Sequence, residues 1–218
     1  MTEAKAKLQA ARDAVRMKAI GIQGGVYIGF TPIDVRFLED AVVQFLTAQA
    51  LLDGLATTEE GIAIRDILVD KDFEDQNGNA IANRTWQQPI SGGWQGGQNG
   101  STEVQVYQTN KDVDNTQKEL AIYGIRASAV GPGATSTALR VNSITYRRSN
   151  TKIIDIWQIE PLDAVPERQI FARTPLLYKK GDNARIDFVP KASVLSGQTD
   201  NLILLGKIAE PLGKEING

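Results

Sequence analysis

The chain of 218 residues contains no histidine and no cysteine. Histidine is the only side chain whose ordinary pKa lets it change charge near neutral pH, and cysteine is the most easily activated nucleophile in proteins. Their absence excludes a Ser-His-Asp triad, a Cys-His pair, a thiol redox centre, a zinc site built from His or Cys, and a haem held by either residue. The remaining chemistry must use carboxylates, Lys, Arg, Tyr, Ser, Thr or the backbone.

Several sequence motifs of enzymes are also missing. The sequence has no phosphate-binding GxxxxGK[ST] loop, no dinucleotide-binding GxGxxG after a strand, and no GxSxG nucleophile elbow. The nearest approach to a pair of catalytic carboxylates is Asp155 and Glu160, which flank Trp157. Their separation places them on opposite faces of a strand, which counts against a shared cleft. We therefore expect a protein that is not an enzyme and that holds no cofactor and no metal.

Long hydrophobic runs and a strong net charge are absent as well. No apolar run approaches the roughly 18 to 20 residues that span a bilayer, and the first residues lack the apolar core of a secretion signal. Hydrophobic residues make up 42% of the chain, charged residues 23%, and the net charge is -2. Together these features predict a soluble globular protein without a signal peptide. The near-neutral charge also argues against a protein that coats nucleic acid with most of its surface.

The N-terminal residues 2–19 have the periodicity of a short amphipathic helix. Ala4, Leu8, Ala11 and Val15 form one narrow apolar stripe. We interpret residues 1–24 as a helical arm followed by a glycine-rich spacer. The basic residues on the other faces of this arm are Lys5, Lys7, Arg12, Arg16 and Lys18. They are either solvated, or they touch lipid, nucleic acid or a neighbouring subunit.

A second helix is predicted at about 33–53. Thr31 and Pro32 form a typical helix start, Asp34 lies three residues after the threonine, and Gly54 is a plausible C-cap. Its apolar stripe is broad enough to pack on a sheet or on another chain.

From Gly61 onward the period of the apolar residues changes to two, which is typical of strands. Turn sequences such as Asn77-Gly78 and Gly181-Asp182 separate the segments. Short strands without intervening helices favour an antiparallel β-sandwich, similar to a jelly roll, over residues 25–218. The predicted strands are Ile62–Val69, Glu103–Gln108, Glu119–Ala127, Leu139–Arg148, Lys152–Glu160, Gln169–Tyr178, Asn183–Val189 and Asn201–Ala209.

Two of these strands have informative patterns. Ala184 and Ile186 alternate with Arg185 and Asp187, which predicts one core face and one face in solvent. The segment 153–159 is apolar on both faces, so we expect it to be central in its sheet or covered by a partner.

The uncharged segment 86–100 shows no periodicity and contains two of the three tryptophans. An indole ring beside amides suits a contact between subunits, where Trp is a favoured anchor, and it also suits a sugar site. A contact loop, an ordinary mobile loop and a ligand site are the three interpretations. The candidate residues are Trp86, Gln87, Gln88, Trp94, Gln95, Gln98 and Asn99.

The basic arm, the glycine-rich spacer and the cysteine-free sandwich together resemble the jelly-roll coat proteins of icosahedral viruses, in particular the small major capsid proteins of tailless bacteriophages. The segments that carry this resemblance are 119–127, 139–160, 169–189 with its Lys179-Lys180-Gly181-Asp182 turn, and 201–209. The resemblance is architectural and implies a virion protein whose sandwich forms the shell wall. It also implies that the arm and loops contact neighbouring copies and other virion proteins. The helix at 33–53 departs from the simplest pattern, and we interpret it as an added contact element.

The composition favours assembly independently of that resemblance. A chain with few reactive groups and near-neutral charge offers mainly surface for packing against copies of itself. We therefore predict a homo-oligomer that self-assembles into an icosahedral capsid. Two alternatives remain open. One is a carbohydrate- or receptor-binding module, such as a viral spike or fibre, that uses Trp86 and Trp94; the other is a glycan-active enzyme that uses Asp155 and Glu160.

Overall fold

The computed structural model describes residues 6, 21–23, 26–28, 32–68, 72–75, 86–88, 104–109, 117–127, 141–148, 152–159, 162, 168–190 and 200–213. In the described residues the elements, in chain order, are β1 (Gly21–Gln23), β2 (Val26–Ile28), α2 (Pro32–Leu52), the 3-10 helix η1 (Glu59–Gly61), β3 (Ile62–Asp66), β4 (Phe73–Asp75), β5 (Trp86–Gln88), β6 (Val104–Thr109), β7 (Glu119–Ala127), β8 (Val141–Arg148), β9 (Lys152–Gln158), β10 (Gln169–Tyr178), β11 (Ala184–Pro190) and β12 (Asp200–Pro211).

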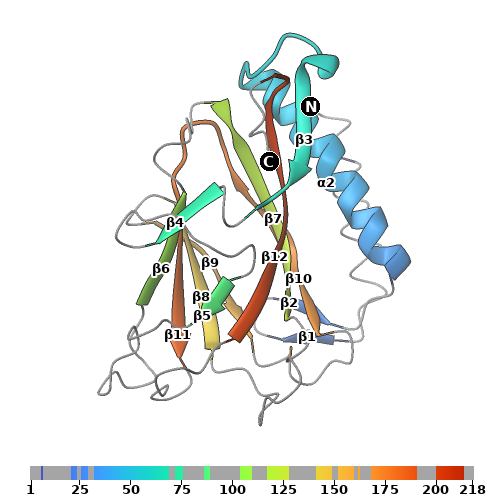
Figure 1. Cartoon of the computed structure of the whole chain (residues 1–218). Helices are drawn as coiled ribbons and strands as arrows, with labels where there is room; N and C mark the ends of the chain where they lie inside the picture. The colour runs from blue at the N-terminus through green and yellow to red at the C-terminus, as the bar shows by residue number, and fades with distance from the viewer. Residues whose placement is uncertain are drawn as a thin grey trace.

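The strands form two sheets that face each other (Figure 1). Sheet A has seven strands in the order β1-β2-β10-β7-β12-β3, and β5 pairs with the first residues of β12. Sheet B has five strands in the order β4-β6-β11-β8-β9. Neighbouring strands within each sheet are antiparallel. The prediction of a mainly β, antiparallel protein with one longer helix is confirmed.

Alternate residues of the central strand β7 serve two different cores. Leu120 and Ile122 belong to the cluster between the two sheets, whereas Ala121 and Tyr123 belong to the cluster under α2. This follows because successive side chains of a strand point to opposite faces. Sheet A is therefore covered on both faces, which explains why eight of the nine residues of β7 are buried.

Helix α2 forms a third layer on the outer face of sheet A (Figure 1). Leu38, Val42, Leu46 and Ala50 repeat every four residues and are at most 2% exposed. Burying each larger side chain of this stripe contributes roughly 1.5 to 3 kcal/mol. The helix ends before Gly54, whose φ of 70° is in the left-handed region that glycine adopts easily. The predicted stripe thus packs on a sheet of its own chain.

All eight predicted strands are present, with ends shifted by a few residues. The sequence patterns did not predict β1, β4 and β5 as strands, because each is only three residues long and too short to show a period. The predicted arm helix lies outside the described residues except for Ala6, whereas Gly21–Gln23 of the predicted spacer form β1 of sheet A. The arm itself stays a prediction.

Strand β9 is the last strand of sheet B in the described residues rather than a central one, and its Ile153 and Ile156 are 47% and 43% exposed. The other alternative, that a partner covers this strand, stays a prediction. The expectation about the face of Asp187 is wrong. Asp187, expected in solvent, is fully buried beside Arg147 and Arg185. Alternation gives the face on which a residue lies, but it does not show whether that face is covered.

Candidate functional site

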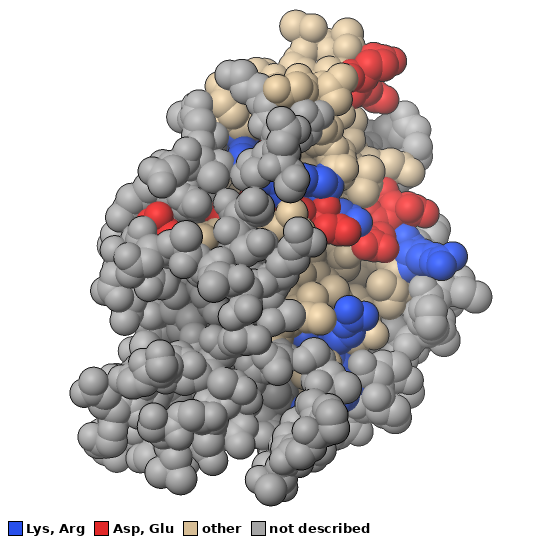
Figure 2. Space-filling view, viewed as in Figure 1, with Lys and Arg blue, Asp and Glu red and all other residues tan. Residues whose placement is uncertain are grey.

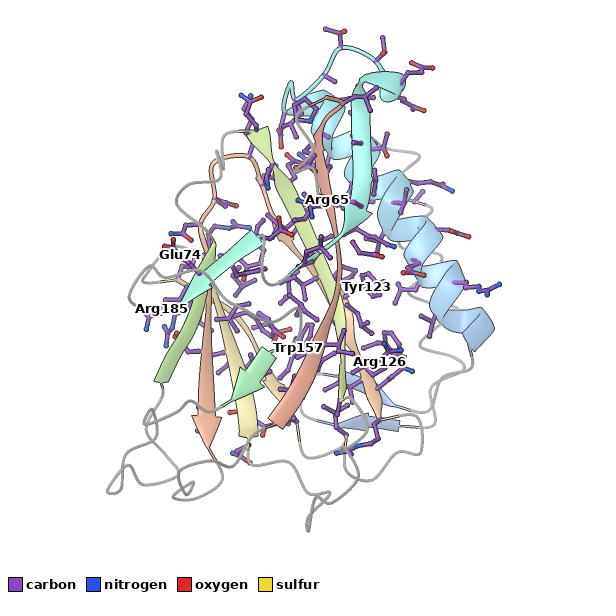
Figure 3. All side chains as sticks on the ribbon, viewed as in Figure 1. Arg65, Glu74, Tyr123, Arg126, Trp157 and Arg185 are labelled. Atoms are coloured by element: carbon purple, nitrogen blue, oxygen red, sulfur yellow. The ribbon has the colours of Figure 1, made fainter. Side chains whose placement is uncertain are left out.

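Four charged side chains meet inside the sandwich at the end of β12 that pairs with β3. Figure 3 labels one of them, Arg65. Arg65 of β3 places its Nη1 and Nη2 2.8 and 2.7 Å from the two carboxylate oxygens of Asp72. Its Nε donates to Oε1 of Glu210 on β12 at 2.6 Å. Lys118, just before β7, places Nζ 3.3 Å from Asp72 and 3.6 Å from Glu210.

This four-residue network balances its own charge. The side chains of Asp72 and Glu210 are 1% exposed and that of Lys118 is 6% exposed, so two anions and two cations share one buried volume. Burial alone would lower the pKa of Arg65, but the hydrogen bonds and charges of Asp72 and Glu210 outweigh burial and raise it. Each carboxylate is therefore already paired with a cation. Such a network suits fold specification rather than acid or base catalysis.

A second polar cluster joins the C-terminal end of α2 to the start of β7. Glu119 is buried beside Asp53, and its Oε2 has no hydrogen-bond donor. Burial, followed by the hydrogen bond with Asp53 and the charge of Asp53, raises the pKa of Glu119 to about 8. The same hydrogen bond lowers the pKa of Asp53, which also accepts from Gln49 at 2.6 Å. A proton on Glu119 thus allows one carboxyl group to donate to the other.

Further along the helix, α2 and sheet A are joined by a chain of polar contacts. The hydroxyl of Tyr123 donates to Oε1 of Glu39 at 2.7 Å, and Lys207 Nζ lies 3.0 Å from the same oxygen. Lys207 also donates to Asp66 at 2.6 Å. Burial would lower the pKa of Lys207, but its hydrogen bonds to Asp66 and Glu39 raise it. These contacts fix the position of α2 over the sheet.

Sheet B carries its own buried ion cluster. Asp187 of β11 accepts from Nε of Arg147 at 2.6 Å and from Nε of Arg185 at 2.7 Å. Arg147 and Arg185 lie directly opposite each other on β8 and β11. On the described part of the face seen in Figure 2, acidic and basic side chains are likewise interspersed rather than gathered by sign. The described clusters therefore offer no patch of one charge for a highly charged ligand.

The predicted tryptophan segment is described only at its start. Trp86, Gln87 and Gln88 form β5, which pairs with Leu202, Asn201 and Asp200 of β12, so the segment begins as a strand and not as a loop. Trp94, Gln95, Gln98 and Asn99 lie outside the described residues, as do Lys5, Lys7, Arg12, Arg16 and Lys18 of the arm. The contact and ligand interpretations of both segments stay predictions.

The carboxylate pair considered for hydrolysis is described at one member only. Asp155 Oδ2 accepts from Nε1 of the fully buried Trp157 at 3.0 Å, and its Oδ1 accepts from the backbone of Ile156. Glu160 lies outside the described residues. Asp155 therefore orients a core tryptophan.

Sequence reasoning did not identify the buried charge networks. Arg65 and Glu210 are 145 residues apart, and Lys118 and Asp72 are 46 apart. No local spacing reports such pairs. The sequence signals for these networks were charged residues next to apolar strands, where a side chain lies close to the core. Lys118 directly precedes one such strand, and Glu210 lies at the end of another.

No group of three or more carboxylates able to hold a metal ion occurs among the described residues. Within the same part of the chain, none of the helices is long and apolar enough to cross a membrane. A scan against protein-family models and a search of curated proteins found no match to this chain.

Proposed function

We propose that this chain is a structural coat subunit that assembles with copies of itself into a closed virion shell, and that its sandwich is a jelly roll. The observation that carries this proposal is the nesting of the strand pairs. β8 pairs with β9, β7 with β10, β6 with β11, and β3 with β12. Each pair encloses the previous one in sequence, and the successive pairs alternate between sheets B and A. One long hairpin rolled up in this way gives the eight strands and two sheets of a jelly roll.

The state of the buried charges supports a structural role over a catalytic one. Catalytic carboxylates need an open approach for substrate, whereas Asp72, Glu210 and Asp187 each bind arginine. Their charges stabilise the relation between strands far apart in the sequence. A coat subunit makes the same contacts at many equivalent positions and must therefore keep one shape. Buried charge pairs that fix which strands lie together help to keep that shape.

Assembly would use the parts of the surface that the third layer leaves open. Helix α2 covers the outer face of sheet A, so in the described residues the sheet edges remain for neighbouring copies. The predicted contacts of the arm and the tryptophan segment with copies and other virion proteins would add to these. Each contact can be modest, because symmetry repeats it and many weak contacts sum to a stable shell.

The test is the mass of the purified protein across a range of concentrations, measured by native mass spectrometry and by negative-stain electron microscopy. We expect regular oligomers and closed particles of uniform size. A protein that stays monomeric at high concentration and forms no regular particle would overturn the proposal.

A further inference from the structure

Strand β9 presents an apolar edge. Among the described residues β9 pairs only with β8, and it ends the strand order of sheet B. Ile153 and Ile156 of this strand are two of the four large hydrophobic side chains that are exposed in the part of the chain that the structure describes. An edge strand also offers backbone N–H and C=O groups that can pair with another strand.

A bulge brings the two isoleucines to the same face. Ile156 lies opposite Thr145 and Ile153 lies opposite Arg147, two residues apart on β8 and hence on one face of the sheet. The register shifts between Tyr146 and Arg147, where β9 contains the extra residue Ile154. In a regular strand, positions 153 and 156 would lie on opposite faces. The outer face of sheet B therefore has two exposed isoleucines along its edge.

We propose that β9 pairs with β9 of a second copy, in antiparallel register, about a two-fold axis midway between Ile154 and Asp155. In this register Ile153 lies opposite the partner's Ile156, and Ile156 lies opposite the partner's Ile153. Both members of each pair are on the outer face, as cross-strand neighbours must be. The inference rests on the proposed self-assembly and names one of its contacts.

Charges in the same register are complementary. Lys152 lies opposite the partner's Trp157, so the partner's Asp155 is its diagonal neighbour on the inner face, within reach of a long side chain. Lys152 is exposed and Asp155 is half-buried. The two-fold axis repeats this pair of opposite charges. A bulge normally discourages edge pairing, but here both bulges fall at the axis, and the matched pairs lie on either side of it.

A second copy fits this edge better than an unrelated strand. The same short sequence, when paired with itself, places each isoleucine opposite an isoleucine and each lysine near an aspartate. The contact is small compared with the roughly 1,200 to 2,000 Å² that a stable isolated complex buries. It therefore acts as one of several repeated contacts in an assembly.

The chain has no cysteine, so introduced cysteines report contacts without background. The test variant is Ile153→Cys with Ile156→Cys, oxidised at a concentration where oligomers form and analysed by non-reducing electrophoresis. Directly opposed residues across a strand pair are about 5 Å apart at Cβ, which suits a disulfide. Within one chain the bulge leaves the two positions opposite residues two apart on β8, roughly 7 Å apart, which is still too far for a disulfide with its Cβ separation of about 4 Å. Two controls are Ile153→Cys alone and the pair Leu52→Cys with Leu212→Cys, whose leucines are each 62% exposed.

We expect the test variant to give the band of a covalent dimer, and we expect neither control to give this band. We also expect Ile156→Lys to lower the amount of oligomer, while Leu52→Lys leaves it unchanged. Regular particles without a dimer band in the test variant would overturn this contact and leave the proposed function standing. A monomeric wild-type protein would overturn both.

Discussion

Glu119 gives the protein a stability that falls as the pH rises. Its pKa is about 8 in the folded protein, against an ordinary value of 4.5, because it is buried and faces Asp53. A group with a raised pKa holds its proton more tightly in the folded state than in the unfolded chain. Its contribution is complete below about pH 4.5 and is lost as the pH rises through about 8.

The size of this effect follows from the shift. The difference between 8 and 4.5 is about 3.5 units, and each unit corresponds to about 1.4 kcal/mol of unfolding free energy. The full shift would give about 5 kcal/mol. Asp53 is only partly buried, so solvent screens the pair, and we expect roughly 1 to 3 kcal/mol to be lost between pH 5 and pH 9.

The test compares urea unfolding of the wild type and Glu119→Gln from pH 5 to pH 9. Glutamine keeps the shape of Glu119, donates to Asp53 without a proton from solvent, and does not ionise. We expect the variant to gain stability relative to the wild type as the pH rises, by the 1 to 3 kcal/mol given above. Both proteins are measured at a concentration where native mass spectrometry shows a single species.

The matched control is Glu210→Gln, the same substitution at a buried glutamate that faces Arg65 and Lys118 instead of a carboxyl. It leaves Arg65 and Lys118 to share the single buried counter-charge of Asp72, so we expect a loss of about 3 kcal/mol at pH 7. Parallel stability curves of wild type and Glu119→Gln from pH 5 to pH 9 would refute the shared proton.

Three further predictions concern packing, a buried hydroxyl and the tryptophan segment. A Cβ on Gly206 would overlap Cδ1 of Ile67 and would lie 2.8 Å from the backbone oxygen of Ala121 on β7, so we expect Gly206→Ala to cost roughly 2 kcal/mol in urea unfolding; an unchanged midpoint would contradict this close packing. The hydroxyl of Tyr146 is buried without a hydrogen-bond partner, so we expect Tyr146→Phe to be neutral or to stabilise by about 1 kcal/mol, and a clear loss in the same assay would show that the hydroxyl is bonded. We expect Trp86→Ala with Trp94→Ala to lower the yield of particles in negative stain; binding to a glycan array that this variant loses would instead favour a carbohydrate-binding module.

Local patterns predicted most of the fold because they report burial on one face at a time. The period-two runs gave β7 and β10 with the same bounds as the structure, and the capping residues around Pro32 gave α2. The position of a strand within its sheet is a different kind of information. Strand β9 has apolar residues on both faces, a pattern typical of a central strand, yet it forms an edge.

The candidate sites were harder to predict than the fold because their partners come from distant parts of the chain. Asp187 alternates with core residues as a solvent-exposed aspartate would, and only the arginines that β8 and β11 bring beside it explain its burial. Glu119 is the first residue of an apolar strand, where an exposed charge is common. Its raised pKa depends on Asp53, the residue after the end of α2, a contact between elements that no spacing in the sequence encodes.

The place of β12 in sheet A has a consequence for synthesis of the chain. β12 lies between β7 and β3, and it leaves the ribosome after both of them. Until residue 211 has emerged, β7 and β3 each lack a neighbour, and the nascent sheet has an open slot between them. The β8 and β9 hairpin, whose loop is short, can close early, whereas the slot closes only after β12 has been translated. Unfinished chains therefore expose two unpaired strand edges, and we expect truncation before residue 200 to yield aggregation instead of a smaller folded protein.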